Sequence, residues 1–124
     1  MKPFFFIRYA GRYQKVSFAD ILYIEACKNY CRIVMHNRVY MILIALKKLE
    51  ALLPAKDFCR VHRSYVISMD KLMAFDHERA ELPGHTIPIG EQFRQALPRR
   101  VLILQRETTC SEAHGASFLE AETL

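Results

Sequence analysis

The chain has 124 residues, 52% of them hydrophobic, and a formal net charge of +5. This length allows one domain with a modest core. No apolar run approaches the ~20 residues of a transmembrane helix, and the apolar stretch Phe4–Ile7 ends at Arg8 without the cleavage site of a signal peptide. We therefore expect a cytoplasmic protein without membrane association, whose four cysteines are reduced.

The charge is unevenly distributed along the chain. Residues 1–104 hold 17 Lys and Arg against 9 Asp and Glu, a net charge of +8, whereas residues 105–124 hold one Arg against four Glu, a net charge of −3. A basic body favours an anionic partner. Because residues 105–124 are small, polar and unpatterned, we predict one domain over residues 1–104 and a flexible, mildly acidic tail over 105–124.

Short strand patterns fill the first third of the chain. Strands are expected at residues 4–9, 13–18, 21–26, 30–35 and 38–43, with turns at 10–12, 28–29 and 36–37. The spacing of apolar residues then changes to three and four at Leu46, Leu49 and Leu53. This predicts a short amphipathic helix that lacks a side-chain cap at its start and ends at Pro54.

The second half of the chain continues the pattern of short elements. A strand-like run covers residues 58–67, and shorter strands are expected at 72–75, 80–82 and 86–89. The pattern from Gly90 to Leu97 suits a short helix stopped by Pro98, and 101–104 is a last apolar run. About ten short strands and two short helices, without βαβ alternation, predict a mainly β fold of antiparallel sheets.

A cluster of polar side chains interrupts the run 58–67. Arg60, His62 and Arg63 fall within four positions, next to the hydroxyl of Ser64. Side chains alternate along a strand, so Arg60 and His62 should share a face, and Arg63 must either turn the chain or emerge at a rim. The forked donors of Arg suit a phosphate or a base edge. The alternatives are a solvated rim arginine, a packed histidine, an arginine paired with a carboxylate, and a hydroxyl that caps the turn.

Other kinds of chemistry find little support in the sequence. There is no glycine-rich phosphate loop, nucleophile elbow or two-histidine metal motif. Cys59 and His62 should lie on opposite faces of a strand, and Cys27, Cys31 and His36 lack a second pair of zinc ligands. We therefore expect no enzymatic activity and neither a metal nor another cofactor. A basic protein–protein interaction module, with only incidental DNA binding, is the alternative to a DNA-binding function.

Four segments, in order and at sensible spacing, resemble the LytTR family of bacterial DNA-binding domains: residues 20–26 followed by Asn29 and Tyr30, and residues 46–53, 58–65 and 87–94. The resemblance covers roughly residues 3 to 100. It implies an elongated arrangement of antiparallel sheets that sets loops into successive major grooves of double-stranded DNA. It also implies a bacterial transcriptional regulator of two-component signalling that binds promoter direct repeats. A second copy on the DNA, and a separate receiver domain or sensor kinase if the chain stands alone, are the further partners expected.

The resemblance places the DNA contacts on three loops. The predicted contact residues are Lys28, Asn29, Tyr30, Arg60, His62, Arg63, Ser64, Gln92 and Arg94. Asn29 also suits a left-handed turn position. Relatives often have a serine and a basic residue where this chain has Gly90 and Glu91. Glu91 would repel phosphate, but it can accept a hydrogen bond from a cytosine amino group, which puts the third contact in doubt or shifts it to Gln92.

Four further charged residues are given structural interpretations. Lys47 and Lys48 should lie on the solvated face of the first helix, and Asp20 and Glu25 should be turn and edge residues around an apolar strand.

Overall fold

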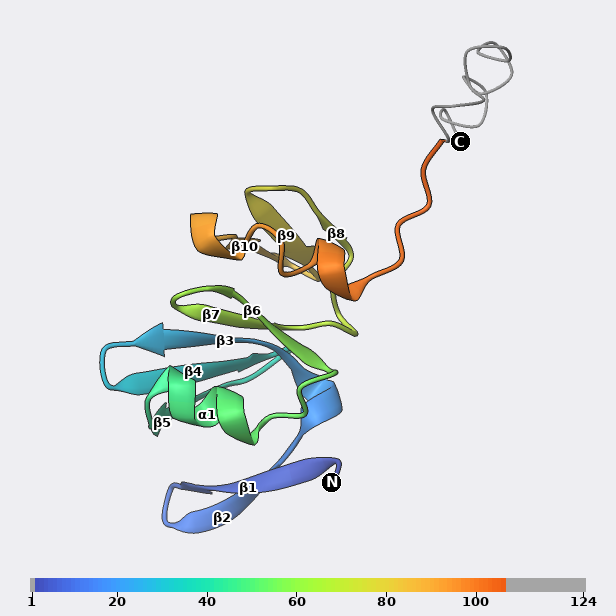
Figure 1. The fold of residues 1–124 in the computed structure, drawn as a ribbon. Coiled ribbons are helices and arrows are strands. Elements are labelled where there is room, and N and C mark those ends of the chain that lie inside the picture. The colour runs from blue at the N-terminus through green and yellow to red at the C-terminus, as the bar shows by residue number, and fades with distance from the viewer. Residues whose placement is uncertain (1, 107–124) are drawn as a thin grey trace, which may run out of the picture.

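Residues 2–106, the part of the chain that the computed structural model describes, form ten strands in three antiparallel sheets (Figure 1). β1 (Phe4–Tyr9) and β2 (Arg12–Ser17) form a hairpin. A five-stranded sheet in the order β5-β4-β3-β7-β6 contains β3 (Ile21–Cys27), β4 (Tyr30–Met35), β5 (Val39–Leu43), β6 (Phe58–His62) and β7 (Tyr65–Ser68). The third sheet contains β8 (Ala74–Phe75), β9 (Arg79–Leu82) and β10 (His85–Pro88). The expected mainly β, antiparallel fold is confirmed.

The helices of the described residues are short. α1 (Leu46–Leu52) starts without a side-chain cap, as expected, and Leu53 before Pro54 is extended, which is the conformation that a following proline favours. The segment from Gly90 to Leu97 begins with the 3-10 helix η2 (Glu91–Phe93) and continues as turns. Two further 3-10 helices are η1 (Phe18–Asp20) and η3 (Pro98–Arg100). No helix in the described part of the chain is long and apolar enough to cross a bilayer.

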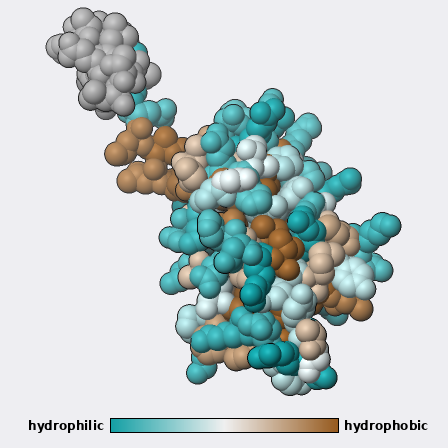
Figure 2. Space-filling view, turned by 180° about the vertical axis from the view of Figure 1, so that it is seen from behind, coloured by the Kyte–Doolittle hydropathy of each residue, from teal (hydrophilic) through white to brown (hydrophobic). Residues whose placement is uncertain are grey.

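The run at residues 58–67 is two strands rather than one, because the chain turns back at Arg63 and Ser64. The last apolar run forms no strand: Leu102 and Leu104 are exposed, and hydrophobic side chains gather along this segment in Figure 2. The predicted tail lies, from residue 107 on, outside the described residues.

The five-stranded sheet is the middle layer, with a core on each face. On one face, Ile24, Ile33 and Val66 pack with the β1–β2 hairpin and with α1. On the other face, the side chains of β3, β6 and β7 pack with the third sheet and with Leu97. A register shift between Ile21 and Tyr23 lets Leu22 and Tyr23 belong to the same core. Both faces of the central strands are therefore buried, and the positions left for function are the strand ends.

Candidate nucleic-acid interface

Three turns that are far apart in sequence lie at one end of the strands. They are Lys28–Tyr30 between β3 and β4, His62–Ser64 between β6 and β7, and Gly90–Arg94 around η2, and we call them together the turn end (Figure 1, left). Two backbone hydrogen bonds join them: Ala26 N–H donates to the carbonyl of Ser64 at 2.8 Å, and Gly90 N–H donates to the carbonyl of Val61 at 2.8 Å. The structure thus brings the three predicted loops together.

The turn between β3 and β4 is tight and exposed. Cys27 and Tyr30 are the last paired residues, so Lys28 and Asn29 form its tip, and the side chains of Lys28, Asn29 and Tyr30 are all exposed. Lys28 has a φ of 58°, whereas Asn29 is not among the residues with positive φ. The left-handed position that Asn29 would suit is therefore held by Lys28.

Arg60 holds the turn between β6 and β7 from within. Its Nε donates to the carbonyl of His62 at 2.8 Å, and a terminal nitrogen donates to the carbonyl of Arg63. The other terminal nitrogen bonds Glu50 Oε1 on α1 at 2.8 Å, and the guanidinium lies 6.0 Å from the ring centre of Phe93 in η2. Each of the three guanidinium nitrogens of Arg60 therefore donates one hydrogen bond within the protein. Its expected pairing with a carboxylate is found.

His62 is built into the same turn, while Arg63 is free. The backbone N–H of Ser64 donates to Nδ1 of His62 at 3.0 Å, and the imidazole packs edge-on against Tyr65 at 5.4 Å. Since Nδ1 accepts, the hydrogen of the neutral ring is on Nε2. Because of a register shift in β6, Arg60 pairs with Val66 and His62 pairs with the preceding residue of β7, Tyr65. Arg60 and His62 therefore lie on opposite faces, and the expected shared face is wrong. Arg63 is exposed and has no hydrogen bond or ion pair from its side chain in residues 2–106.

Glycine at position 90 allows η2 to pack closely on β6. A Cβ there would lie 3.2 Å from the Phe93 ring and 3.5 Å from the imidazole of His62. Glu91, Gln92 and Arg94 follow with exposed side chains. A side chain at position 90 would therefore need a small shift of the Phe93 ring. The two exposed side chains predicted here, Gln92 and Arg94, are held beside the turn of Arg63.

Glu25 supports the turn end, which the sequence interpretation as an edge residue missed. It lies on β3, the central strand, opposite Arg32 on β4 and Tyr65 on β7. Arg32 forms an ion pair with it, and the Tyr65 hydroxyl donates to it at 3.0 Å. The hydrogen bond to Glu25 raises the pKa of Arg32, and burial, followed by that hydrogen bond, raises the pKa of Tyr65. A turn at 28–29 already sets Glu25 opposite Arg32, so this pair had a sequence signal.

Two lysines of α1 border the turn end. Lys47 and Lys48, expected to be merely solvated, line the same surface hollow as Lys28 and Asn29. The hollow separates the β3–β4 turn from the start of α1. A row of positive charge therefore extends from this turn onto the helix.

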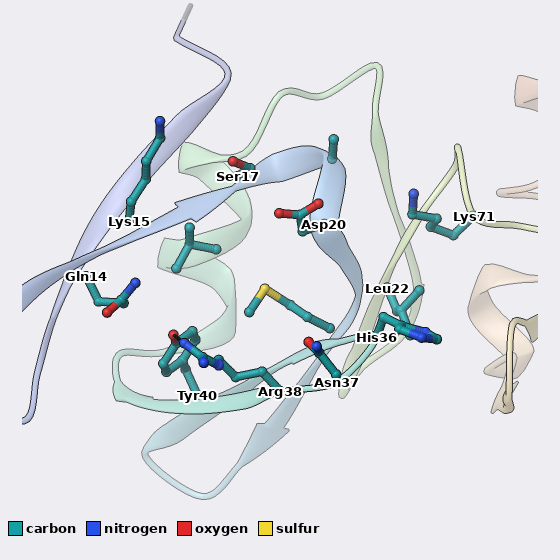
Figure 3. A pocket seen from close by; sticks show the side chains of 13 residues that line it. Gln14, Lys15, Ser17, Asp20, Leu22, His36, Asn37, Arg38, Tyr40 and Lys71 are labelled. Carbon is teal, nitrogen blue, oxygen red and sulfur yellow. Dashed lines mark hydrogen bonds between the residues drawn. The ribbon is translucent and has the colours of Figure 1, made fainter.

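The opposite end of the same strands has a hollow of about 490 Å³ (Figure 3). It is lined by residues of β2, η1, the β4–β5 turn and the β7–β8 connection, among them Lys15, Asp20, His36, Arg38 and Lys71. Its cations have partners: Lys15 lies over the Phe4 ring at 4.4 Å, Arg38 donates to the Tyr40 hydroxyl at 2.6 Å, and Lys71 pairs with Asp70 at 3.4 Å. None of the predicted contact residues lines this hollow.

Comparison with known proteins identifies the family that the sequence segments resemble. The family model described as the LytTr DNA-binding domain matches residues 11–101. A solved structure, the LytTr DNA-binding domain of a putative methyl-accepting/DNA response regulator from Bacillus cereus, superposes with a TM-score of 0.70 at 18% sequence identity. The match covers 81% of this chain and 97% of that one. No curated protein sequence matches the chain significantly.

Proposed function

Because the chain belongs to the LytTr DNA-binding domain family, we propose that it is a sequence-specific transcriptional regulator that reads double-stranded DNA with its turn end. One observation carries this proposal: three turns, distant in sequence and tied by backbone hydrogen bonds, present unpartnered polar and basic side chains at one end of the described domain. Such an arrangement meets a duplex without a recognition helix. The three turns would enter successive major grooves.

The exposed side chains divide into two roles. Arg63 is the best candidate for a base contact, since its free guanidinium can donate two hydrogen bonds to a guanine edge. Asn29 has the donor and acceptor that suit an adenine edge. Lys28 and Arg94 are placed for phosphates, which supply most of the affinity and no sequence information directly. Tyr30, exposed beside the tip of the first turn, can donate its hydroxyl to a phosphate.

Arg60, His62 and Ser64 act mainly by positioning. Arg60 fixes the carbonyls of His62 and Arg63, and His62 accepts from the Ser64 amide, so together they set the direction of Arg63. The Ser64 hydroxyl remains a candidate phosphate donor. Arg60, expected from the sequence to contact DNA, would thus hold the contact residue Arg63 in place instead.

The third turn, around η2, exposes the Glu91 carboxylate together with the Gln92 amide and the Arg94 guanidinium. Glu91 and Gln92 are adjacent and exposed. Glu91 fits a cytosine amino group and disfavours a phosphate, whereas Gln92 fits an adenine edge. We therefore expect this turn to contribute base choice more than affinity.

The biological setting is part of the same proposal. The similar Bacillus cereus domain is described as part of a putative methyl-accepting/DNA response regulator, which supports a role in two-component signalling in the bacterial cytoplasm. Binding to promoter direct repeats by two copies, and control by a receiver domain or sensor kinase, would follow from that role.

Selection of bound fragments from a random duplex library tests the proposal. We expect enrichment of one motif, in pairs about one helical turn apart if two copies bind together. A salt titration on the enriched and on random duplexes should show steep salt dependence with a marked preference for the enriched motif. Flat, sequence-blind binding would instead support a basic interaction module.

A further inference from the structure

The β1–β2 hairpin carries positive charge without an opposing carboxylate. Residues 2–19 contain four cations, Lys2, Arg8, Arg12 and Lys15, and the first acidic residue of the chain is Asp20. Three of these cations lie on the two hairpin strands, and all three are exposed. Positive charge concentrated on a two-stranded ribbon favours an anionic partner.

The tip of the hairpin repeats one pair of residues on both sides of a two-residue turn. Arg8 and Tyr9 precede Ala10 and Gly11, and Arg12 and Tyr13 follow them. Tyr9 pairs with Arg12 and Arg8 pairs with Tyr13 across the strands, so each face of the tip has one arginine and one tyrosine. The φ angles of Ala10 and Gly11 are 55° and 76°, as in the compact turns that suit hairpins.

Contacts within the hairpin hold these groups at the surface. The Arg8 guanidinium lies 5.2 Å from the ring centre of Tyr13 and donates to its hydroxyl at 3.3 Å, while the Tyr13 side chain is 68% exposed. On the other face, the Tyr9 ring packs at 4.9 Å against Tyr40 of β5, which fixes the tip on the five-stranded sheet. Arg12 is exposed, with no side-chain partner in residues 2–106. The tip thus offers preorganised donors with few internal acceptors.

The tip of the hairpin also lies where it could contact the same ligand as the turn end. Figure 1 shows the β1–β2 turn at the same end of the molecule as the β3–β4 turn, the β6–β7 turn and η2. The family match begins at residue 11, so β1 and Arg8 lie outside it. A ligand contact by the first strand is therefore something that family membership alone does not supply.

We propose that the tip of the β1–β2 hairpin, with Arg8, Arg12 and Tyr13, is a fourth DNA contact that binds phosphates of the duplex beside the segment met by the turn end. This inference rests on the proposed function. Guanidinium and phenol donors on both faces of a narrow ribbon suit phosphate oxygens, which accept from arginine and tyrosine alike. The hairpin therefore adds affinity and footprint length, while the choice of sequence stays with the turn end.

The test compares the variant Arg8→Gln/Arg12→Gln with the control Lys56→Gln/Lys71→Gln, in the full chain. Both remove two positive charges, but Lys56 and Lys71 lie near the other end of the strands, in the α1–β6 and β7–β8 connections. Counterion release predicts that each lost phosphate contact costs about fivefold in affinity at 0.15 M salt and lowers the salt slope by about one. We expect the hairpin variant to lose roughly 25-fold on selected and random duplexes alike, with a slope reduced by about two, and the control to lose less than threefold.

Hydroxyl-radical footprinting gives a second measurement on the same proteins. The wild type should protect a stretch of backbone at one end of the selected site that the hairpin variant leaves open. Equal affinity, slope and footprint for the wild type and a folded hairpin variant would overturn the fourth contact while leaving the proposed function intact. If the wild type itself bound all duplexes without motif preference, the proposed function would be overturned instead.

Discussion

The two ends of the five-stranded sheet both carry cations, but they differ in what those cations do. At the turn end, Lys28, Arg63 and Arg94 are exposed and have no ion-pair partner in residues 2–106. At the opposite end, Lys15, Arg38 and Lys71 contact an aromatic ring, a hydroxyl or a carboxylate. The density of positive charge alone would not separate the two ends. At the turn end, by contrast, three basic side chains that are unpartnered in residues 2–106 come from turns that backbone hydrogen bonds tie together, whereas exposed Lys56 at the other end lies alone in the α1–β6 connection. We therefore propose the turn end as the surface for a polyanion.

Arg60 and Arg63 show the same difference within one turn. Arg60 bonds two carbonyls and a carboxylate, whereas Arg63 extends outward three residues later. Arg60 stabilises the turn, and Arg63 is exposed on the surface of that turn. The following variants test this division of labour.

The largest effect is expected for Arg60→Ala. Removal of the guanidinium leaves two carbonyls and the Glu50 carboxylate without their donor, and hydrogen bonds to charged groups contribute about 1.5–3 kcal/mol each. We expect the free energy of unfolding, measured by urea denaturation, to fall by about 2–3 kcal/mol, and the DNA affinity of the folded variant to fall with it. Unchanged stability would show that Arg60 does not hold the turn.

Arg63→Ala should have the complementary effect. We expect specific binding to weaken by about 1–3 kcal/mol, with relaxed choice at one base pair and a free energy of unfolding within about 0.5 kcal/mol of the wild type. Fluorescence anisotropy on selected and mismatched duplexes measures the affinity and the base choice, and urea denaturation measures the free energy of unfolding. Undiminished binding to the selected duplex would remove Arg63 from the contacts.

Tyr65→Phe tests the support that Glu25 gives to the turn end. Loss of the hydrogen bond should destabilise the protein by about 1 kcal/mol. Burial and this bond raise the pKa of Tyr65 above its ordinary 10.0, so above pH 10 the folded chain keeps a proton that the unfolded chain releases. The Tyr65 contribution to stability is thus fully present below pH 10 and is lost as the pH rises further. Denaturation series from pH 7 to 11 should show a steeper alkaline decline for the wild type than for Tyr65→Phe; parallel curves would contradict the assignment.

Lys28→Gly should change stability and affinity in opposite directions. Lys28 has a φ of 58°, a conformation that costs most residues about 1–2 kcal/mol and glycine much less. We expect the free energy of unfolding to rise by up to about 1 kcal/mol, while affinity at 0.15 M salt falls about fivefold through loss of a phosphate contact. Lys28→Asn is the matched control, since Asn tolerates this conformation and also lacks the charge. An affinity that survives both substitutions would place Lys28 off the DNA.

Lys71→Ala should have the smallest effect, because Lys71 lies at the opposite end and already contacts Asp70. We expect the DNA affinity to change less than twofold, because an exposed ion pair away from the binding surface contributes little. A loss as large as that of Lys28→Gly would mean that total charge, rather than its place, governs binding.

The sequence predicted the succession of elements well, because turn residues and changes of period mark each boundary. The alternative that Arg63 turns the chain is what the structure shows. The Glu25–Arg32 pair was also within reach, since it follows from hairpin register. The Arg60–Glu50 bond was not, because it depends on how α1 packs across the sheet.

Two local details were beyond propensity arguments. Lys28 rather than Asn29 has the positive φ, since the tight turn sets its conformation by position and not by residue preference. The close approach of η2 to β6 at Gly90 is a tertiary contact with Phe93 and His62 that no local pattern marks. The DNA contacts of the exposed side chains stay predictions, which the variants above test.

Titration of the isotope-labelled protein with its selected duplex, followed by amide chemical shifts, tests the central claim most directly. The account predicts the largest shifts at Lys28–Tyr30, His62–Ser64 and Gly90–Arg94, and small shifts at residues 36–38 and 71. Shifts concentrated around the opposite hollow, with the three turns unaffected, would contradict it.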